Sequence, residues 1–393
     1  MAMRVGFLGV QCGNPNLGVA ALGYSVLRIM HQLLPDAAEF VLFSPDTQSA
    51  LDRVGRTLSL DGKRLVAATI RHRHIWKLHK AMRSCDLIID LTGGDSFSDI
   101  YGLRRLMVNL ADKEMVLLSG TPLVIAPQTI GPFRSRLTRP VVRHVLNNSA
   151  LVFARDELSR DAAAAVTRRE VVVATDVALA LPFDRSLYPL PPASTVRVGV
   201  NVSGLLWNGG YTKNNQFGLL TDYRKYCSLL VDRLHADGLE VHLIPHVIGR
   251  GGSLDEDDVT ACEQILANQP GCTLAPRFRD PVEAKSYIAS LDVMVGARMH
   301  ATIAAFTAGL ATIPLAYSRK FAGYYSNLGY ADLVDLTELD TASALDRTAE
   351  LINDRERLQE AARRSHGVAD KKLAEFTMRL AEILPAGNAN SVK

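Results

Sequence analysis

The length, composition and charge of the chain exclude several classes of protein. Its 393 residues exceed what one ordinary hydrophobic core accommodates and suit two domains. Hydrophobic residues make up 48% of the chain, which argues against disorder, and 44 basic against 41 acidic residues give no sign of a nucleic-acid-binding surface. No run approaches the roughly 20 apolar residues that a membrane-spanning helix requires.

The five cysteines are scattered along the chain and form no C-x-x-C pair. We therefore expect neither a disulfide framework nor a structural zinc site, and a reducing cytoplasm is the better fit. The apolar N-terminal segment is too short for a signal peptide and is better explained as a first buried strand.

The first half alternates short apolar runs with helical patterns, for example over residues 19–34 and 103–118. The runs are rich in Val, Ile and Leu without clean alternation, as in a parallel sheet covered on both faces. Strand, helix and strand in this order predict right-handed crossovers and a doubly wound sheet. The expected strands are residues 4–10, 39–43, 65–70, 86–91, 123–126, 150–154 and 170–173.

A stretch with four prolines and no periodic pattern precedes a second alternating series. There we expect helices over 219–236, 255–267, 281–290 and 299–308, and strands over 196–202, 239–244, 292–295 and 312–316. A charged helical pattern continues over 342–384.

The two halves predict two Rossmann-like, doubly wound domains that face a cleft. In such sheets ligands bind beyond the carboxyl ends of the strands, so functional residues should directly follow the predicted strands. We expect an N-terminal domain over 1–181, a proline-rich linker over 182–195, a C-terminal domain over 196–340 and a helical tail over 341–393.

Polar and glycine-rich turns do follow the strands of the first half. Asn16 and Gly18 open a helix whose free N–H groups suit an anion, although a tight turn explains them equally well. Gly94 belongs to a glycine pair that forms either an anion-binding nest or a plain turn. Asp95 is a candidate base, with helix capping as the alternative, and Gln128 follows the fifth strand.

Arg155 follows the sixth predicted strand and is expected to point toward the cleft. A local ion pair with Asp156 or Glu157 is the alternative. Because buried arginines are rare without a partner, we favour a functional role.

The sharpest feature of the second half is the pair Arg298 and His300, placed where a strand ends and an Ala-rich, apolar helix begins. Such a helix should be buried, so both side chains are expected at the crevice, near an anion. Capping or a core position is the alternative for His300, and the adjacent arginine disfavours it. Lys320 adds positive charge after the next strand. His242 and His246 have metal-pair spacing but lie on a proline-broken strand pattern, so we predict no metal site.

Several of these segments, in this order, resemble the polysaccharide pyruvyl transferase family from about residue 4 to residue 320. The segments are the turn Asn16-x-Gly18, LIIDLTGGDSF, APQTIGPF, ARDELS, TDVAL, VGARMHATIAAFTAGL and Tyr-Ser-Arg-Lys. Many members carry an acidic pair just after the first Asn-x-Gly, where this chain has Val19 and Ala20. Contacts made by those acids must therefore be made otherwise here.

The resemblance implies a GT-B-like fold, without a cofactor. It also implies transfer of the enolpyruvyl group of phosphoenolpyruvate onto hydroxyls of a sugar, in a polysaccharide or glycolipid precursor, giving a pyruvate ketal and phosphate. By resemblance, Arg298, His300 and Lys320 belong to the donor site in the C-terminal domain, and Arg155 is implicated as well. His300 is either the proton donor or a phosphate-binding cation. His246 is a substrate-binding residue and a second candidate base.

Two rival functions stay open on the same scaffold: a GT-B glycosyltransferase using a nucleotide sugar, and a non-catalytic glycan- or anion-binding protein. The sequence does not identify the acceptor sugar or its carrier, which is a lipid, a nucleotide or a polymer. It also does not determine whether the protein is a homo-oligomer. Contact with the inner face of the cell membrane is also left open by the basic run 71–77, for which a solvated helix face is the favoured explanation.

Overall fold

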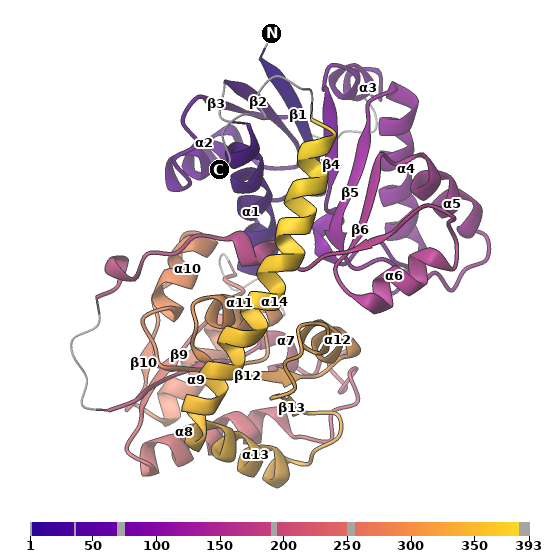
Figure 1. The fold of residues 1–393 in the computed structure, drawn as a ribbon. Coiled ribbons are helices and arrows are strands. Elements are labelled where there is room, and N and C mark those ends of the chain that lie inside the picture. The colour runs from indigo at the N-terminus through magenta and orange to yellow at the C-terminus, as the bar shows by residue number, and fades with distance from the viewer. Residues whose placement is uncertain (1, 35–36, 69–74, 190–194, 250–255, 385–393) are drawn as a thin grey trace. The chain divides into compact units, whose positions relative to one another are not determined.

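A computed structural model describes residues 2–34, 37–68, 75–189, 195–249 and 256–384 (Figure 1). The chain forms two compact units. Unit 1 comprises Met1–Asn14, Leu22–Leu181 and Ala369–Lys393, and unit 2 comprises Pro15–Ala21 and Pro182–Val368.

Within the described part of unit 1, seven parallel strands form one sheet in the order β3-β2-β1-β4-β5-β6-β7. Figure 1 shows α1 and α2 on one face of this sheet and α3, α4 and α5 on the other. The strands are β1 (Met3–Leu8), β2 (Ala38–Phe43), β3 (Lys63–Ala67), β4 (Leu87–Asp90), β5 (Leu123–Gln128), β6 (Leu151–Ala154) and β7 (Val172–Val173). The helices are α1 (Leu17–Leu33), α2 (Gln48–Thr57), α3 (Ile75–Arg83), α4 (Leu103–Ser119), α5 (Arg139–Asn148) and α6 (Glu157–Ala164).

The described part of unit 2 holds a six-stranded parallel sheet in the order β10-β9-β8-β11-β12-β13. Its strands are β8 (Arg197–Asn201), β9 (Glu240–Leu243), β10 (Thr273–Leu274), β11 (Val293–Gly296), β12 (Ala311–Ala316) and β13 (Val334–Asp335). Its helices are α7 (Gly204–Trp207), α8 (Tyr223–Ala236), α9 (Asp258–Asn268), α10 (Pro281–Ile288), α11 (Met299–Thr307), α12 (Arg319–Asn327) and α13 (Thr341–Asn353).

The predicted fold class of two parallel α/β domains is confirmed, and each expected strand has a counterpart within a few residues. Two further strands, β10 and β13, have no counterpart among the expected strands; each is two residues long and pairs at a sheet edge. The end of expected strand 65–70, the run 71–74 and the start of expected helix 255–267 lie outside the described residues.

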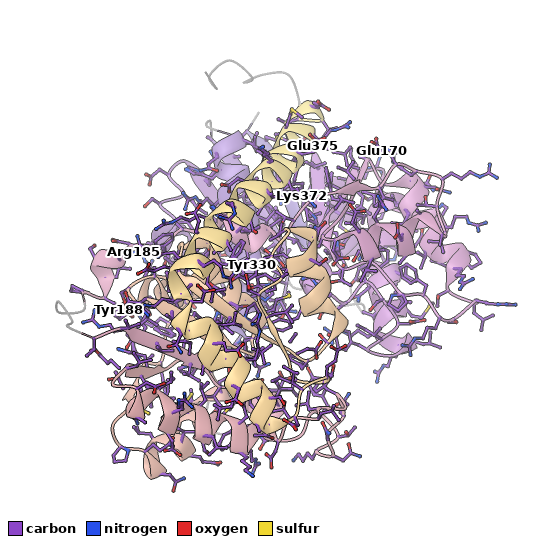
Figure 2. All side chains as sticks on the ribbon, turned by 60° about the horizontal axis from the view of Figure 1, so that its bottom comes forward. Glu170, Arg185, Tyr188, Tyr330, Lys372 and Glu375 are labelled. Carbon is purple, nitrogen blue, oxygen red and sulfur yellow. The ribbon has the colours of Figure 1, made fainter. Side chains whose placement is uncertain are left out.

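The structure places the described residues of the expected linker in unit 2. Arg185 lies in a 3-10 turn and donates hydrogen bonds to the carbonyls of Ala289 and Ala308, at 2.7 and 2.8 Å. Tyr188 packs edge-on against Tyr287, with ring centroids 5.3 Å apart. Arg185 and Tyr188, both labelled in Figure 2, attach this segment to unit 2 rather than leaving it a free connection.

The helical tail divides between the two units. Its long helix α14 (Arg355–Glu382) belongs to unit 2 up to Val368 and to unit 1 from Ala369. In unit 1 the ring of Phe376 packs edge-on against Phe153 of β6, with centroids 4.9 Å apart. Lys372 and Glu375 lie on the same part of α14 (Figure 2).

Candidate functional site

Arg298 lies between β11 and α11, where its backbone joins three strand ends of unit 2. Its N–H donates to Oδ1 of Asn201, the last residue of β8, at 2.8 Å. Nδ2 of Asn201 in turn donates to the carbonyl of Ile244, just after β9, at 2.8 Å. Parallel strands place their carboxyl ends at one edge, so the turns after β8, β9 and β11 meet there.

The guanidinium of Arg298 is buried and already paired. Its Nη2 lies 2.8 Å from Oδ1 of Asp258 and 2.8 Å from the carbonyl of Glu256, and its Nη1 lies 3.3 Å from Oε2 of Glu256. Burial lowers the pKa of Arg298, but the charge of Asp258 and its hydrogen bond outweigh burial and raise it. The arginine is therefore a fixed cation held by two carboxylates.

Asp258 organises this edge of the sheet from a fully buried position. Besides Arg298, its Oδ1 accepts the N–H of Gly204 at 2.8 Å. Its Oδ2 accepts the N–H groups of His246 and Val247 at 3.0 and 2.9 Å. One carboxylate thus holds together the turns after β8, β9 and β11 and the start of α9.

The first turn of α1 belongs to unit 2 and contacts His300. The N–H of Leu17 donates to the carbonyl of His246 at 3.0 Å, and Oδ1 of Asn16 accepts the N–H of Gly18 at 3.0 Å. A Cβ atom at Gly18 would lie 2.4 Å from Nδ1 of His300. The glycine is required because the imidazole occupies the place where any side chain would stand.

His246 is buried between charged neighbours, and none of the described residues forms a hydrogen bond with its Nδ1. Burial, together with the charges of His300 and Arg298, lowers its pKa to about 3. The ring is therefore neutral at physiological pH. His242, the other member of the discounted metal pair, bonds through Nδ1 to the hydroxyl of Tyr287 at 2.8 Å.

Unit 1 has its own buried polar group after β4. Nζ of Lys113 lies 3.1 Å from Oδ2 of Asp90 and donates to Oγ1 of Thr92 at 2.5 Å. Nε2 of Gln128 donates to the same Asp90 oxygen at 3.0 Å, while its buried Oε1 has no partner in the part of the chain that the structure describes. Gly94 ends this turn with a φ of +86°, a left-handed conformation that favours glycine. These contacts position the turn before Asp95.

Arg155 lies in unit 1 and is 1% exposed. Its Nη1 lies 3.1 Å from Oδ2 of Asp176, its Nη2 donates to Oγ1 of Thr129 at 2.6 Å, and its Nε lies 3.8 Å from Oδ2 of Asp156. Burial lowers its pKa, but the charges of Asp176, Asp156 and Asp95 outweigh burial and raise it. Arg155 therefore does form the local ion pair with Asp156 that was the alternative to a functional role. It also forms an ion pair with a second carboxylate, that of Asp176.

Asp95 is half-buried, and its Oδ2 accepts the hydroxyl of Tyr101 at 2.6 Å. It does not cap α4, whose N-cap is Gly102, so the capping alternative does not apply to that helix. Lys320 lies in the first turn of α12, and its side chain is outside the described part of the chain.

The predicted site residues thus form two groups, one in each unit. Unit 2 brings together Asn16, Gly18, His246, Arg298 and His300, and unit 1 holds Gly94, Asp95, Gln128 and Arg155.

Sequence reasoning missed the carboxylates that hold the arginines. Asp258 is the last residue of the acidic run 255–258, and Asp176 lies in the TDVAL segment. Two observations could have indicated these aspartates. A buried arginine needs an acidic partner. Each aspartate also lies at the start of a helical segment, Asp258 as the first residue of α9 and Asp176 just before a 3-10 helix. Sequence separation hid the pairing, because Arg298 and Asp258 are 40 residues apart.

Comparison with solved structures identifies the class of fold. A putative UDP-N-acetylglucosamine 2-epimerase from Listeria monocytogenes matches with a TM-score of 0.62 at 10% identity, covering 100% of both chains. A UDP-GlcNAc 2-epimerase from Neisseria meningitidis has a TM-score of 0.59 at 10% identity, covering 96% of this chain and 100% of that one. MurG of Acinetobacter baumannii has a TM-score of 0.51 at 12% identity, covering 97% and 99%. The chain therefore has a GT-B-like fold.

The family follows from the sequence match. The family model described as polysaccharide pyruvyl transferase matches residues 16–319. The chain belongs to this family, and it is a transferase. Comparison with curated protein sequences finds no match. Within the described residues, no helix combines the length and apolar character needed to cross a bilayer.

Proposed function

We propose that the protein transfers the enolpyruvyl group of phosphoenolpyruvate onto two hydroxyls of a sugar in a polysaccharide or glycolipid precursor. The family match carries this proposal, because it spans both Asn16–Gly18 and Arg298–His300. These two segments meet in unit 2, where Gly18 leaves room for the imidazole of His300.

The reaction needs fixed positive charge and a proton donor. Phosphoenolpyruvate carries a carboxylate and a phosphate, and arginine and helix N-termini both suit such groups. Arg298 precedes the first turn of α11 at the edge of the sheet, and His300 lies within that turn. We therefore assign the donor to this edge, with Lys320 as a further cation.

The transfer consists of one protonation, two attacks on one carbon and the loss of phosphate. The methylene carbon of phosphoenolpyruvate accepts a proton, and a sugar hydroxyl attacks the adjacent carbon as it loses its own proton. A second hydroxyl attacks the same carbon, the bond from that carbon to the phosphate oxygen breaks, and phosphate leaves with the remaining proton. The products are a pyruvate ketal and inorganic phosphate. Preorganised cations stabilise the charge that collects on the leaving phosphate.

His300 acts in this scheme either as the proton donor or as a cation for the phosphate. Asp95 and His246 are the two candidates for the base that takes the hydroxyl proton. Full turnover in an Asp95→Asn variant would remove Asp95 from this role. Nδ1 of neutral His246, which has no partner among the described residues, can form a hydrogen bond with the substrate.

Release of inorganic phosphate from phosphoenolpyruvate, in the presence of candidate acceptor sugars, tests the function. Release of nucleoside diphosphate from a nucleotide sugar instead would assign the protein to the glycosyltransferases. Thermal stabilisation by either donor without turnover would assign a binding protein.

The His300→Gln variant tests the site. We expect its turnover to fall about 100-fold or more if His300 donates the proton, and its phosphoenolpyruvate affinity to fall if it binds phosphate. His144→Gln is the control, because His144 is an exposed residue of α5 paired with Glu114. Unchanged rate and unchanged affinity in His300→Gln would remove His300 from both roles.

A further inference from the structure

An exposed surface of unit 1 combines apolar side chains with arginines. It lies over the loop before α4, the first two turns of α4 and the segment between β5 and α5. We call it the arginine-apolar surface, and its members are Ile100, Leu103, Arg104, Arg105, Met107, Val108, Arg134, Arg136, Leu137 and Arg139.

The two segments of this surface are held side by side. The N–H of Ser135 donates to Oδ2 of Asp99 at 2.9 Å, and the N–H of Gly131 donates to the carbonyl of Phe97 at 2.8 Å. The rings of Phe97 and Phe133 pack edge-on beneath them, with centroids 5.6 Å apart. The surface is therefore built on a packed base that joins both segments.

Helix α4 is apolar on two faces rather than one. Leu106 and Leu110 are 0% and 1% exposed and pack into the core of unit 1. Leu103 and Met107, one turn apart, are 47% and 48% exposed, and Leu137 of the adjoining segment is 88% exposed. Grouped exposed aliphatic side chains of this kind mark a contact surface rather than ordinary scatter.

The charge of this surface has one sign. Residues 100–111 and 131–140 together contain five arginines and no acidic residue. The neighbouring Asp99 accepts the backbone bond from Ser135, and Asp95 accepts the hydroxyl of Tyr101. The guanidinium of Arg105 lies 4.8 Å from the ring centre of Tyr101, and Nε of Arg139 donates to the carbonyl of Phe133 at 3.3 Å.

We propose that the arginine-apolar surface docks unit 1 on a membrane that contains anionic lipid. Arginines attract the negative surface of such a membrane, while exposed Leu, Met and Val side chains enter the boundary between headgroups and acyl chains. A nucleic acid would use the arginines and leave the aliphatic side chains in water. The combination of both kinds of side chain favours the lipid surface.

Sedimentation with vesicles tests the proposal on the full chain, independently of any enzymatic activity. We expect the protein to bind vesicles of phosphatidylcholine mixed with phosphatidylglycerol, and not vesicles of phosphatidylcholine alone. The double variant Arg104→Gln with Arg105→Gln should lower the partition coefficient about 30-fold, because each arginine contributes roughly a factor of five near an anionic surface. The double variant Leu103→Gln with Met107→Gln should also weaken binding.

Matched controls come from α14, where Arg363, Arg364 and Met378 are exposed and lie outside the surface. Substituting these residues by Gln should leave vesicle binding unchanged. The proposal would be overturned if the Arg363 and Arg364 substitutions weakened vesicle binding as much as the Arg104 and Arg105 substitutions. Equal binding to vesicles of phosphatidylcholine alone and to vesicles with phosphatidylglycerol would also overturn it. Binding to heparin that survives the Leu103 and Met107 substitutions, without vesicle binding, would assign a polyanion instead. Loss of vesicle binding through Trp76→Ser alone, a residue of α3 that is 83% exposed, would place the contact elsewhere.

Discussion

Gly18 and His300 show how closely one residue of unit 2 depends on another. In the variant Gly18→Ala the added methyl group would lie 2.4 Å from Nδ1 of His300, so the imidazole must move. We expect turnover to fall about tenfold or more while the fold is retained, since small displacements in a site cost large factors in rate. Steady-state kinetics together with circular dichroism check this prediction.

Gly367→Ala is the matched control for this substitution. Gly367 lies within α14, where a Cβ atom would meet none of the described atoms outside its own helical turn within 4 Å. The change should stabilise the helix by about 0.5–1 kcal/mol and leave turnover unaffected. Full activity in Gly18→Ala would show that His300 does not need its present position.

His246 makes stability depend on pH. Its pKa of about 3 in the folded protein is below the ordinary 6.5, so between these values the unfolded chain binds a proton that the folded chain does not. Unfolding free energy should therefore decrease as the pH falls from 6.5 toward 3, by up to about 1.4 kcal/mol per pH unit. In His246→Gln this contribution is absent, and urea titrations from pH 7 to pH 5 should show a shallower decline, by about 2 kcal/mol in total. His79→Gln on α3 serves as the control, and parallel declines in wild type and His246→Gln would contradict the assignment.

At the residue scale, the sequence predicts where the site residues lie along the strands and helices, but not which side chains contact them. Arg298 and His300 could be located because a strand pattern ends and an apolar helix begins at that point. Their surroundings could not, since Asp258 reaches Arg298 across 40 residues and only the folded chain brings the two together. Folding also changes the interpretation of His246: its low pKa arises from burial and then from the charges of His300 and Arg298, which no local pattern reveals.

At the scale of elements, aspartate caps explain several helix starts. Asp280 accepts the N–H groups of Val282 and Glu283 at 2.9 and 3.0 Å, and Pro281 occupies the first helical position of α10. Asp280→Ala should cost about 1 kcal/mol of unfolding free energy. Ser318 precedes α12 without a capping bond from its side chain. Ser318→Ala should therefore lower the unfolding free energy by only a few tenths of a kcal/mol. Urea denaturation of the two variants checks the difference, and equal costs would show that the cap at Asp280 contributes nothing specific.

The alternating pattern predicted the parallel strands because strands buried on both faces have continuous apolar sequences. Short edge strands escape this signal: β10 exposes one of its two residues, and β13 pairs through Val334 and Asp335 alone. The composition of the proline-rich segment predicts a linker. Composition does not show that Arg185 finds two carbonyl acceptors in unit 2.

At the scale of the whole molecule, the division into units follows contacts rather than chain order. Residues 15–21 interrupt unit 1 and belong to unit 2, and the end of α14 returns to unit 1. The hydrophobic periodicity of turns and helix ends does not indicate which unit such a segment packs against. Sequence alone therefore suggested contiguous domains, although the main boundary near residue 181 coincides with the unit boundary.

The return of α14 to unit 1 makes a final prediction. Phe376 is fully buried against Phe153, so Phe376→Ala should destabilise unit 1 by about 3–5 kcal/mol, whereas Met378→Ala, at an exposed position of the same helix, should cost little. Trp207 reports on unit 2, because its indole N–H donates to Oε1 of Gln264 at 2.8 Å and its ring is buried. Trp76 of unit 1 is replaced by Phe in both proteins, so that the fluorescence comes from Trp207. In urea, Phe376→Ala should then lower the midpoint of part of the circular dichroism transition and leave the midpoint of Trp207 fluorescence unchanged. An equal shift of both signals would instead mean that the two units unfold as one cooperative body.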